Sequence, residues 1–151
     1  MRSLAGLLIL VACAPSTPAP EPVEPTEEQR EGRIVARVTG FRNGNGQVLA
    51  RLYRGKDGFP GKADKAFHAA TFTIIDGKAT VVFDDVPYGE YAVWVCHDED
   101  GDGKLATNLI GMPKEGADVS GPPPSFIPSY DDARFRLESP EHAIEIALRY
   151  L

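Results

Sequence analysis

Alternation of apolar and polar residues with a period of two constrains this chain more than any other feature. Apolar residues occupy every second position from 34 to 38, and again from 48 to 52. A buried helical face would instead need apolar residues spaced by three and four. The Asn-Gly-Asn-Gly sequence at 43–46 has the residues of a tight turn. The pattern therefore predicts two strands joined as a β-hairpin.

The same alternation recurs downstream and predicts seven short strands in all. A second hairpin is expected from residues 71–75 and 78–83, around the Asp76-Gly77 turn, and residues 91–96 form a continuous apolar run of strand character. Residues 133–137 and 144–150 alternate again. Only one short helical turn is expected, near residues 64–68. Seven strands separated by turns predict an all-β fold, a seven-stranded β-sandwich.

The first twelve residues predict a signal peptide. Arg2 precedes a nine-residue apolar run at 4–12, which covers about half of a ~30 Å hydrocarbon core and is therefore too short to span it. The sequence Leu-Val-Ala-Cys at 10–13 resembles the lipobox of bacterial lipoproteins, which implies cleavage before Cys13 and its lipidation. Ala14 stands where an Asp would imply retention in the inner membrane, so the outer membrane of a Gram-negative host is favoured. The alternative is an ordinary secretory signal with an incidental cysteine.

Residues 13–31 predict a lipidated cysteine followed by a disordered linker. The segment after Cys13 holds five prolines and five glutamates, a composition that cannot form a core. Extended, it reaches up to about 55 Å. The β-sandwich domain then covers residues 32–151. A formal net charge of −6 argues against nucleic acid, so the expected partners are a membrane, through the lipid anchor, and an unidentified envelope protein or ligand.

An acidic loop follows the apolar run at 91–96. Carboxylates at alternate positions before Gly103 resemble the first half of a calcium-binding loop, in which glycine permits the sharp turn. The candidate ligands all offer oxygen atoms: the side chains of Asp98, Asp100 and Asp102, the backbone carbonyl of Lys104, and the side chains of Asn108 and Glu115. An EF-hand would need Glu at its twelfth position, which here is Leu109, so any Ca²⁺ affinity is expected in the weak range of ~10⁻⁴–10⁻³ M. The alternative is a solvated acidic loop without metal.

The residues just before this loop allow two interpretations. Adjacent residues of a strand point to opposite faces, so Cys96 and His97 cannot easily cooperate in catalysis. Cys96 is expected to be a small buried side chain, and His97 a structural histidine hydrogen-bonded into the loop. Together with Trp94 and Phe126, His97 also marks a possible binding surface for a carbohydrate or a peptide, for which the competing interpretation is simple packing.

Two sets of residues resemble known families. The motif Val86-Pro87-x-Gly89-x-Tyr91 resembles prealbumin-like (transthyretin-like) sandwiches, which implies an immunoglobulin/prealbumin-like β-sandwich and a hydrogen bond from the Tyr91 hydroxyl to the backbone. A wider pattern runs from His97-Asp98 through Gly103-Lys104-Leu105 and on to Pro113-Lys114-Glu115-Gly116. Over residues 33–151 this pattern resembles the bacterial family known as domain of unknown function 2141.

The chain departs from the pattern of this family at two places beside the acidic loop. Ala106 stands where the family often has an acid, and residues 117–120 replace its common Tyr-Gly-Phe-Ser-Asn-Asn run. The family has no assigned role, so the resemblance implies a fold and not a function.

The sequence predicts a non-catalytic, lipid-anchored module of the cell envelope, whose acidic loop can be stabilised by Ca²⁺. The alternatives are a carbohydrate- or peptide-binding module and a transthyretin-related hydrolase. The hydrolase would need convergent His, Arg and Ser residues, and no such set is evident in the sequence.

Overall fold

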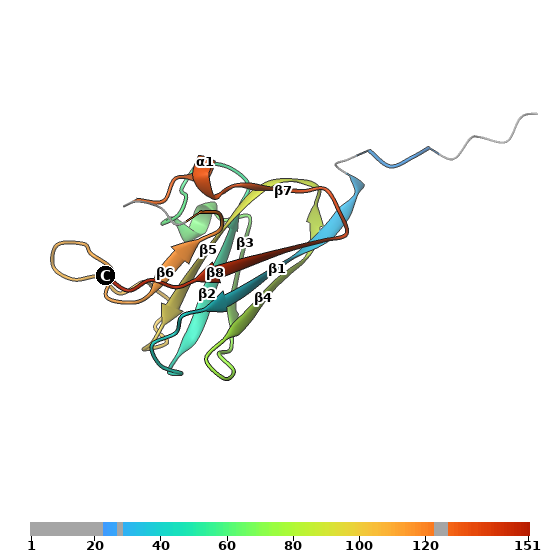
Figure 1. Cartoon of the computed structure of the whole chain (residues 1–151). Helices are drawn as coiled ribbons and strands as arrows, with labels where there is room; N and C mark the ends of the chain where they lie inside the picture. Colours follow the sequence, from blue (N-terminus) through green and yellow to red (C-terminus); the bar gives the residue numbers. More distant parts are fainter. Residues whose placement is uncertain (1–22, 27–28, 123–126) are drawn as a thin grey trace, which may run out of the picture.

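The computed structural model describes residues 23–26, 29–122 and 127–151. The predicted signal peptide, Cys13 and Phe126 lie outside the described residues. Within them the chain is mostly β, with eight strands in two sheets, an arrangement consistent with an all-β sandwich (Figure 1). Among the described residues, no helix is long and apolar enough to cross a membrane.

The smaller sheet has three strands in the order β4-β1-β8. Its central strand pairs antiparallel with β4 and parallel with β8. The strands are β1 (Glu31–Thr39), β4 (Ala79–Pro87) and β8 (Glu141–Ala147).

The larger sheet has the order β3-β2-β5-β6, and β7 pairs with the first residues of β5. Its strands are β2 (Gln47–Tyr53), β3 (His68–Phe72), β5 (Gly89–Asp98), β6 (Ala117–Val119) and β7 (Phe135–Leu137). Two single turns of helix complete the described elements: η2 (Ala63–Lys65) and α1 (Tyr130–Ala133).

Strand β5 is buried on both faces, which explains its continuous apolar sequence. Tyr91, Val93 and Val95 face the space between the sheets and pack with residues such as Ile34 and Val81. On the outer face, a second cluster is covered by the segments that contain β6 and α1. This outer cluster comprises Leu49, Tyr53, Ala92, Trp94, Cys96, Val119, Tyr130 and Ala133.

The first predicted hairpin is wrong, although both of its strands form. β1 and β2 belong to different sheets, so the turn at 43–46 leads the chain from one sheet to the other. Alternation identifies the face of a strand that meets the core, but a strand in either sheet of a sandwich satisfies this requirement equally. The spacing therefore predicts the strands and not their partners.

Of the second predicted hairpin, only the turn forms. Asp76 and Gly77 have φ values of 51° and 70°, and Ile75 and Lys78 form a single antiparallel bridge. Beyond the bridge, β3 pairs with β2 and β4 pairs with β1. The Asp-Gly turn chemistry was predicted correctly, but the flanking strands diverge because each has a longer partner in its own sheet.

The described residues contain one strand more than the seven predicted. The additional strand, β6, has only three residues in a segment rich in glycine and proline, too few for a period to be recognised. The helical turn expected near 64–68 is present as η2 at Ala63–Lys65. The short helix α1 was not predicted. It begins at Ser129, whose hydroxyl accepts a hydrogen bond from the amide of Asp132.

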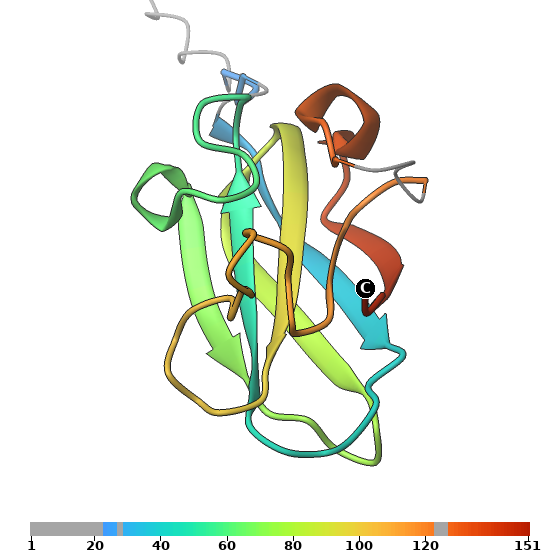
Figure 2. The same ribbon diagram turned by 90° about the vertical axis from the view of Figure 1, so that its left-hand side faces the viewer.

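The two ends of the sandwich are formed by different parts of the chain. The chain enters β1 beside the start of β5, where the amide of Tyr88 donates to the carbonyl of Arg30. Strands β1, β5 and β8 all run away from this entry end, because β8 is parallel to β1. The acidic loop after β5 and the C-terminus therefore lie together at the far end, on the left of Figure 1 and toward the viewer in Figure 2.

Candidate metal-binding loop

Three aspartates at the far end of β5 converge on one point. Asp98 is the last residue of β5 and is fully buried, whereas Asp100 and Asp102 are exposed. One carboxylate oxygen from each lies within 4.8 Å of the other two. Ca²⁺ holds its oxygen ligands at about 2.4 Å, so oxygens on opposite sides of the ion are about 4.8 Å apart. The three side chains can therefore contact a single ion.

Hydrogen bonds within the loop hold these carboxylates in place. Asp98 accepts from the amides of Asp102 (3.1 Å) and Gly103 (3.0 Å), and from the side chain of Gln47 (2.7 Å). Asp100 accepts from the amide of Asp102 at 3.1 Å, and Asp102 accepts from that of Lys104 at 2.8 Å. Gly103 has φ +79°, which confirms that its position needs a glycine. The backbone thus wraps around oxygen atoms that face inward.

The charge of Asp98 is stabilised despite its burial. Burial alone raises the pKa of this carboxyl group, but hydrogen bonds from Gln47, Gly103 and Asp102 outweigh burial, so the pKa lies below its usual value. Asp98 is therefore ionised at neutral pH. A cation at this point would meet at least one ligand that is ionised at neutral pH.

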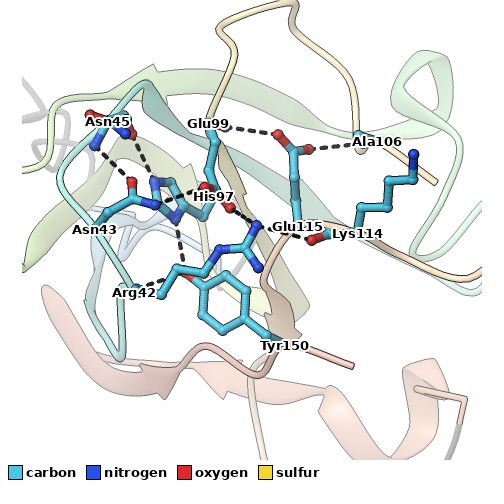
Figure 3. A network of polar contacts seen from close by, with 9 residues as sticks. All are labelled: Arg42, Asn43, Asn45, His97, Glu99, Ala106, Lys114, Glu115 and Tyr150. Atoms are coloured by element: carbon cyan, nitrogen blue, oxygen red, sulfur yellow. Dashed lines mark hydrogen bonds and ion pairs between the residues drawn. The ribbon is translucent and has the colours of Figure 1, made fainter. Parts of the chain in front are cut away.

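The other three candidate ligands have different positions. Glu115 is buried, and its two oxygens accept from the amides of Glu99 and Ala106, each at 2.8 Å (Figure 3). Asn108 accepts with its side-chain oxygen from the amides of Ile110 and Met112. Lys104 is exposed, and its backbone amide donates to the side chain of Asp102. Glu115 lies outside the group of three aspartates and ties the two ends of the loop together.

A polar network lies under the acidic loop and involves His97 (Figure 3). The Nε2 atom of His97 lies 2.7 Å from the carbonyl oxygen of Asn45, and Nδ1 lies 2.8 Å from the hydroxyl of Tyr150. A carbonyl can only accept, so Nε2 carries the hydrogen, and in the neutral ring Nδ1 accepts from the Tyr150 hydroxyl. This hydroxyl also accepts from the amide of Arg42 at 3.2 Å. His97 is therefore a structural histidine, as predicted, but its ring is hydrogen-bonded to the 43–46 turn and to Tyr150 and not to the acidic loop.

Glu99 connects the acidic loop to this network. Its carboxylate is paired with Arg42 and accepts from the side chain of Asn43 at 2.8 Å. Burial raises the pKa of Glu99, and the hydrogen bonds from Asn43 and Arg42 outweigh burial and bring it below the usual value. Arg42 also stacks on Tyr150, with its guanidinium carbon 4.7 Å from the ring centre. The loop is thereby joined to the C-terminal residues.

The predicted binding surface around Trp94 and His97 is not an exposed one. His97 is 0% and Trp94 is 4% exposed, so a ligand cannot reach His97, and at Trp94 it meets only a margin of the ring. The guanidinium of Arg51 covers Trp94 at 4.4 Å, and the packing interpretation holds for both residues. Cys96 is fully buried in the outer cluster, as expected.

Several residues that shape the loop were not predicted. Arg42 and Asn43 come from the connection between β1 and β2, Gln47 is the first residue of β2, and Tyr150 lies after β8. A turn glycine gives the nearest signal: a Cβ on Gly46 would lie 1.9 Å from the backbone oxygen of Asp98. This close contact requires the turn at 43–46 to pack directly on the acidic loop.

The two sheets define an all-β protein. The group of one buried and two exposed aspartates gives this protein a candidate cation-binding loop at one end. A family model described as "Uncharacterized protein conserved in bacteria (DUF2141)" matches residues 36–145. This match covers most of the chain, so the chain belongs to this family. No curated protein and no solved structure gives a significant match.

Proposed function

We propose that this protein is a non-catalytic, lipid-anchored module of the bacterial cell envelope whose far-end loop binds Ca²⁺ weakly. The observation that supports the cation site is the convergence of Asp98, Asp100 and Asp102 within 4.8 Å, in a loop whose amides already hold the carboxylates in position. Hard oxygen donors favour Ca²⁺ over softer metals. With few protein ligands, the expected dissociation constant is in the range of ~10⁻⁴–10⁻³ M.

The non-catalytic assignment is supported by the burial and hydrogen bonding of the potential nucleophile and base that precede the loop. Cys96 and His97 are fully buried, and both ring nitrogens of His97 are engaged. A prealbumin-like arrangement of the sheets is supported by the hydrogen bond from the Tyr91 hydroxyl to the carbonyl of Pro87, at 2.7 Å. This is the contact that the Pro-x-Gly-x-Tyr motif implies.

Lipid anchoring is supported by the Leu-Val-Ala-Cys sequence at 10–13 and by the Pro/Glu-rich residues that follow. The location proposed from these features is the outer membrane, with the sandwich held away from the bilayer by the linker.

Calorimetric titration of the full chain with Ca²⁺ tests the cation site. We expect measurable heat, and we expect the Asp100→Asn variant to lose it, because this exposed ligand can be changed without disturbing the core. At 10 mM Ca²⁺, mass action predicts stabilisation by about 1.4–2.7 kcal/mol for a dissociation constant of ~10⁻³–10⁻⁴ M.

The matched control is Asp76→Asn. Asp76 is exposed on another turn and has φ 51°, a conformation that asparagine tolerates. This variant should bind Ca²⁺ as the unmodified chain does. Absence of heat in the unmodified chain, or equal heat in the Asp100→Asn variant, would remove the calcium proposal.

A further inference from the structure

Four exposed aliphatic side chains belong to segments that line or flank one pocket. Leu109 and Ile110 are 107% and 83% exposed, and Ile127 and Leu151 are 75% and 81% exposed. A pocket of about 210 Å³ is lined by Leu151, by Pro128, which follows Ile127, and by Leu105 and Pro113, which stand on either side of the segment that holds Leu109 and Ile110. Adjoining exposed apolar groups of this kind mark interaction surfaces.

Leu109 and Ile110 stand at the apex of a turn that is held by hydrogen bonds. We call residues 108–112 the apolar tip. The side-chain oxygen of Asn108 accepts from the backbone amides of Ile110 and Met112, both at 3.0 Å. The backbone amide of Asn108 donates to the carbonyl of Met112 at 2.8 Å. Residues 105–113 include no charged side chain. The backbone therefore holds two aliphatic side chains in water at a fixed place.

The pocket can accept such side chains. Its walls include Trp94, Leu105, Pro113 and Val119, and its charged lining residues are Asp118 and Arg149, which form an ion pair at 2.6 Å. The two charges offset each other, so the pocket does not favour a charged ligand. An apolar cavity of about 150 Å³ is enough to hold a benzene-sized group, so 210 Å³ is enough for a branched aliphatic side chain.

The apolar tip and the pocket share their base, because Leu105 and Pro113 flank the tip in sequence and also line the pocket. The apolar tip lies at the end opposite the point where the chain enters β1 (Figures 1 and 2), and the pocket lies beside the base of the tip. A membrane that held the linker would be at the entry end, so the partner at the far end is better sought in another protein molecule. A protrusion and a cavity side by side on one face are self-complementary under a two-fold axis.

We propose that a second copy of this chain docks at the far end, with the apolar tip of each copy in the pocket of the other. The four exposed aliphatic side chains of each copy contribute about 100 Å² apiece. Together with the surface that they cover, they reach the ~1,200 Å² at the lower limit of specific interfaces. The expected dimer is weak and forms between neighbouring molecules that are already held close together.

Site-specific photo-cross-linking in cells that express the full chain tests this proposal. A benzophenone amino acid in place of Leu109 should give an adduct of twice the monomer mass. Mass spectrometry should identify the cross-linked peptide as residues 113–119 or 149–151 of this same chain. The matched control places the benzophenone at Ile75, which is 68% exposed on a different turn and should give at most about one fifth of that adduct.

A second variant tests the pocket without touching the tip. Leu151→Asp changes an exposed terminal residue on the pocket rim, so it cannot disturb the core, and it should lower the self-adduct at least about fivefold. The adduct should persist when Ca²⁺ is chelated, which separates this result from the calcium proposal. An adduct with lipid, polysaccharide or another protein in place of this chain would overturn the proposal, as would equal yields at positions 109 and 75 or no effect of Leu151→Asp.

Discussion

Cys96 shows how burial removes chemistry from a residue that could otherwise react. Burial, followed by the nearby carboxylates of Glu115 and Asp98, raises the pKa of its thiol far above the usual value. The thiolate is the nucleophilic form. We expect no reaction of Cys96 with a thiol reagent in the folded chain and one equivalent of reaction in urea. A Cys13→Ser background leaves Cys96 as the one thiol to be counted, and fast labelling without urea would contradict this expectation.

Glu115 stabilises the acidic loop through two backbone amides. In the Glu115→Gln variant, one carboxylate oxygen becomes an NH₂ group, so a buried N–H donor faces another donor. An unsatisfied buried donor costs about 1–3 kcal/mol. Urea denaturation should show a loss of stability of this size, whereas Glu145→Gln, on the exposed side of β8, should change stability little. Equal stability of the two variants would mean that the amides of Glu99 and Ala106 find other partners.

At the scale of residues, local spacing was informative and long-range contacts were not. Asp98, Asp100 and Asp102 could be predicted as a group because ligands at alternate positions of one loop lie close together whatever the rest of the fold does. Gln47 and Tyr150 contact the same region from 51 and 53 residues away. Nothing in the spacing of one sequence reports such contacts, since they depend on how the sheets are assembled.

The start of β5 is stabilised by one side-chain hydrogen bond. The Tyr91 hydroxyl donates to the carbonyl of Pro87, four residues earlier, at 2.7 Å. Tyr91→Phe keeps the buried ring and removes only this bond, so stability should fall by about 0.5–1.5 kcal/mol in urea denaturation. Tyr88→Phe, three residues before Tyr91 and partly exposed, is the matched control and should have a smaller effect. A larger effect at Tyr88 would show that the turn is held differently.

At the scale of elements, strands could be predicted better than their pairing. Period-two alternation located β1, β2, β4 and β8, each of which buries at least one face, and a continuous apolar run located β5, which is buried on both faces. The Asn-Gly-Asn-Gly and Asp-Gly sequences predict hairpin connections, but both turns lead from one sheet to the other. Turn residues fix the local backbone, but the partner of a strand is decided by which sheet completes the core.

At the scale of the whole molecule, the predicted lipid anchor at Cys13 can be tested by lipid labelling and by membrane recovery. Lipidation at Cys13 predicts that labelled palmitate is incorporated into the full chain and that the chain is recovered with membranes. Cys13→Ser should abolish the label, whereas Cys96→Ala should keep it, because Cys96 is buried within the sandwich. Labelling of the Cys13→Ser variant, or none in the unmodified chain, would contradict the lipobox interpretation.

The direction of β1 determines how far the acidic loop lies from the point where the chain enters the sandwich. Because β1 crosses the sandwich from the entry end to the far end, its nine residues separate the two ends by about 30 Å. In an anchored molecule, the aspartates and the apolar tip would then stand about 30 Å farther from the bilayer than the start of β1. Adding or removing prolines and glutamates in the linker would raise or lower them without altering a single contact in the domain.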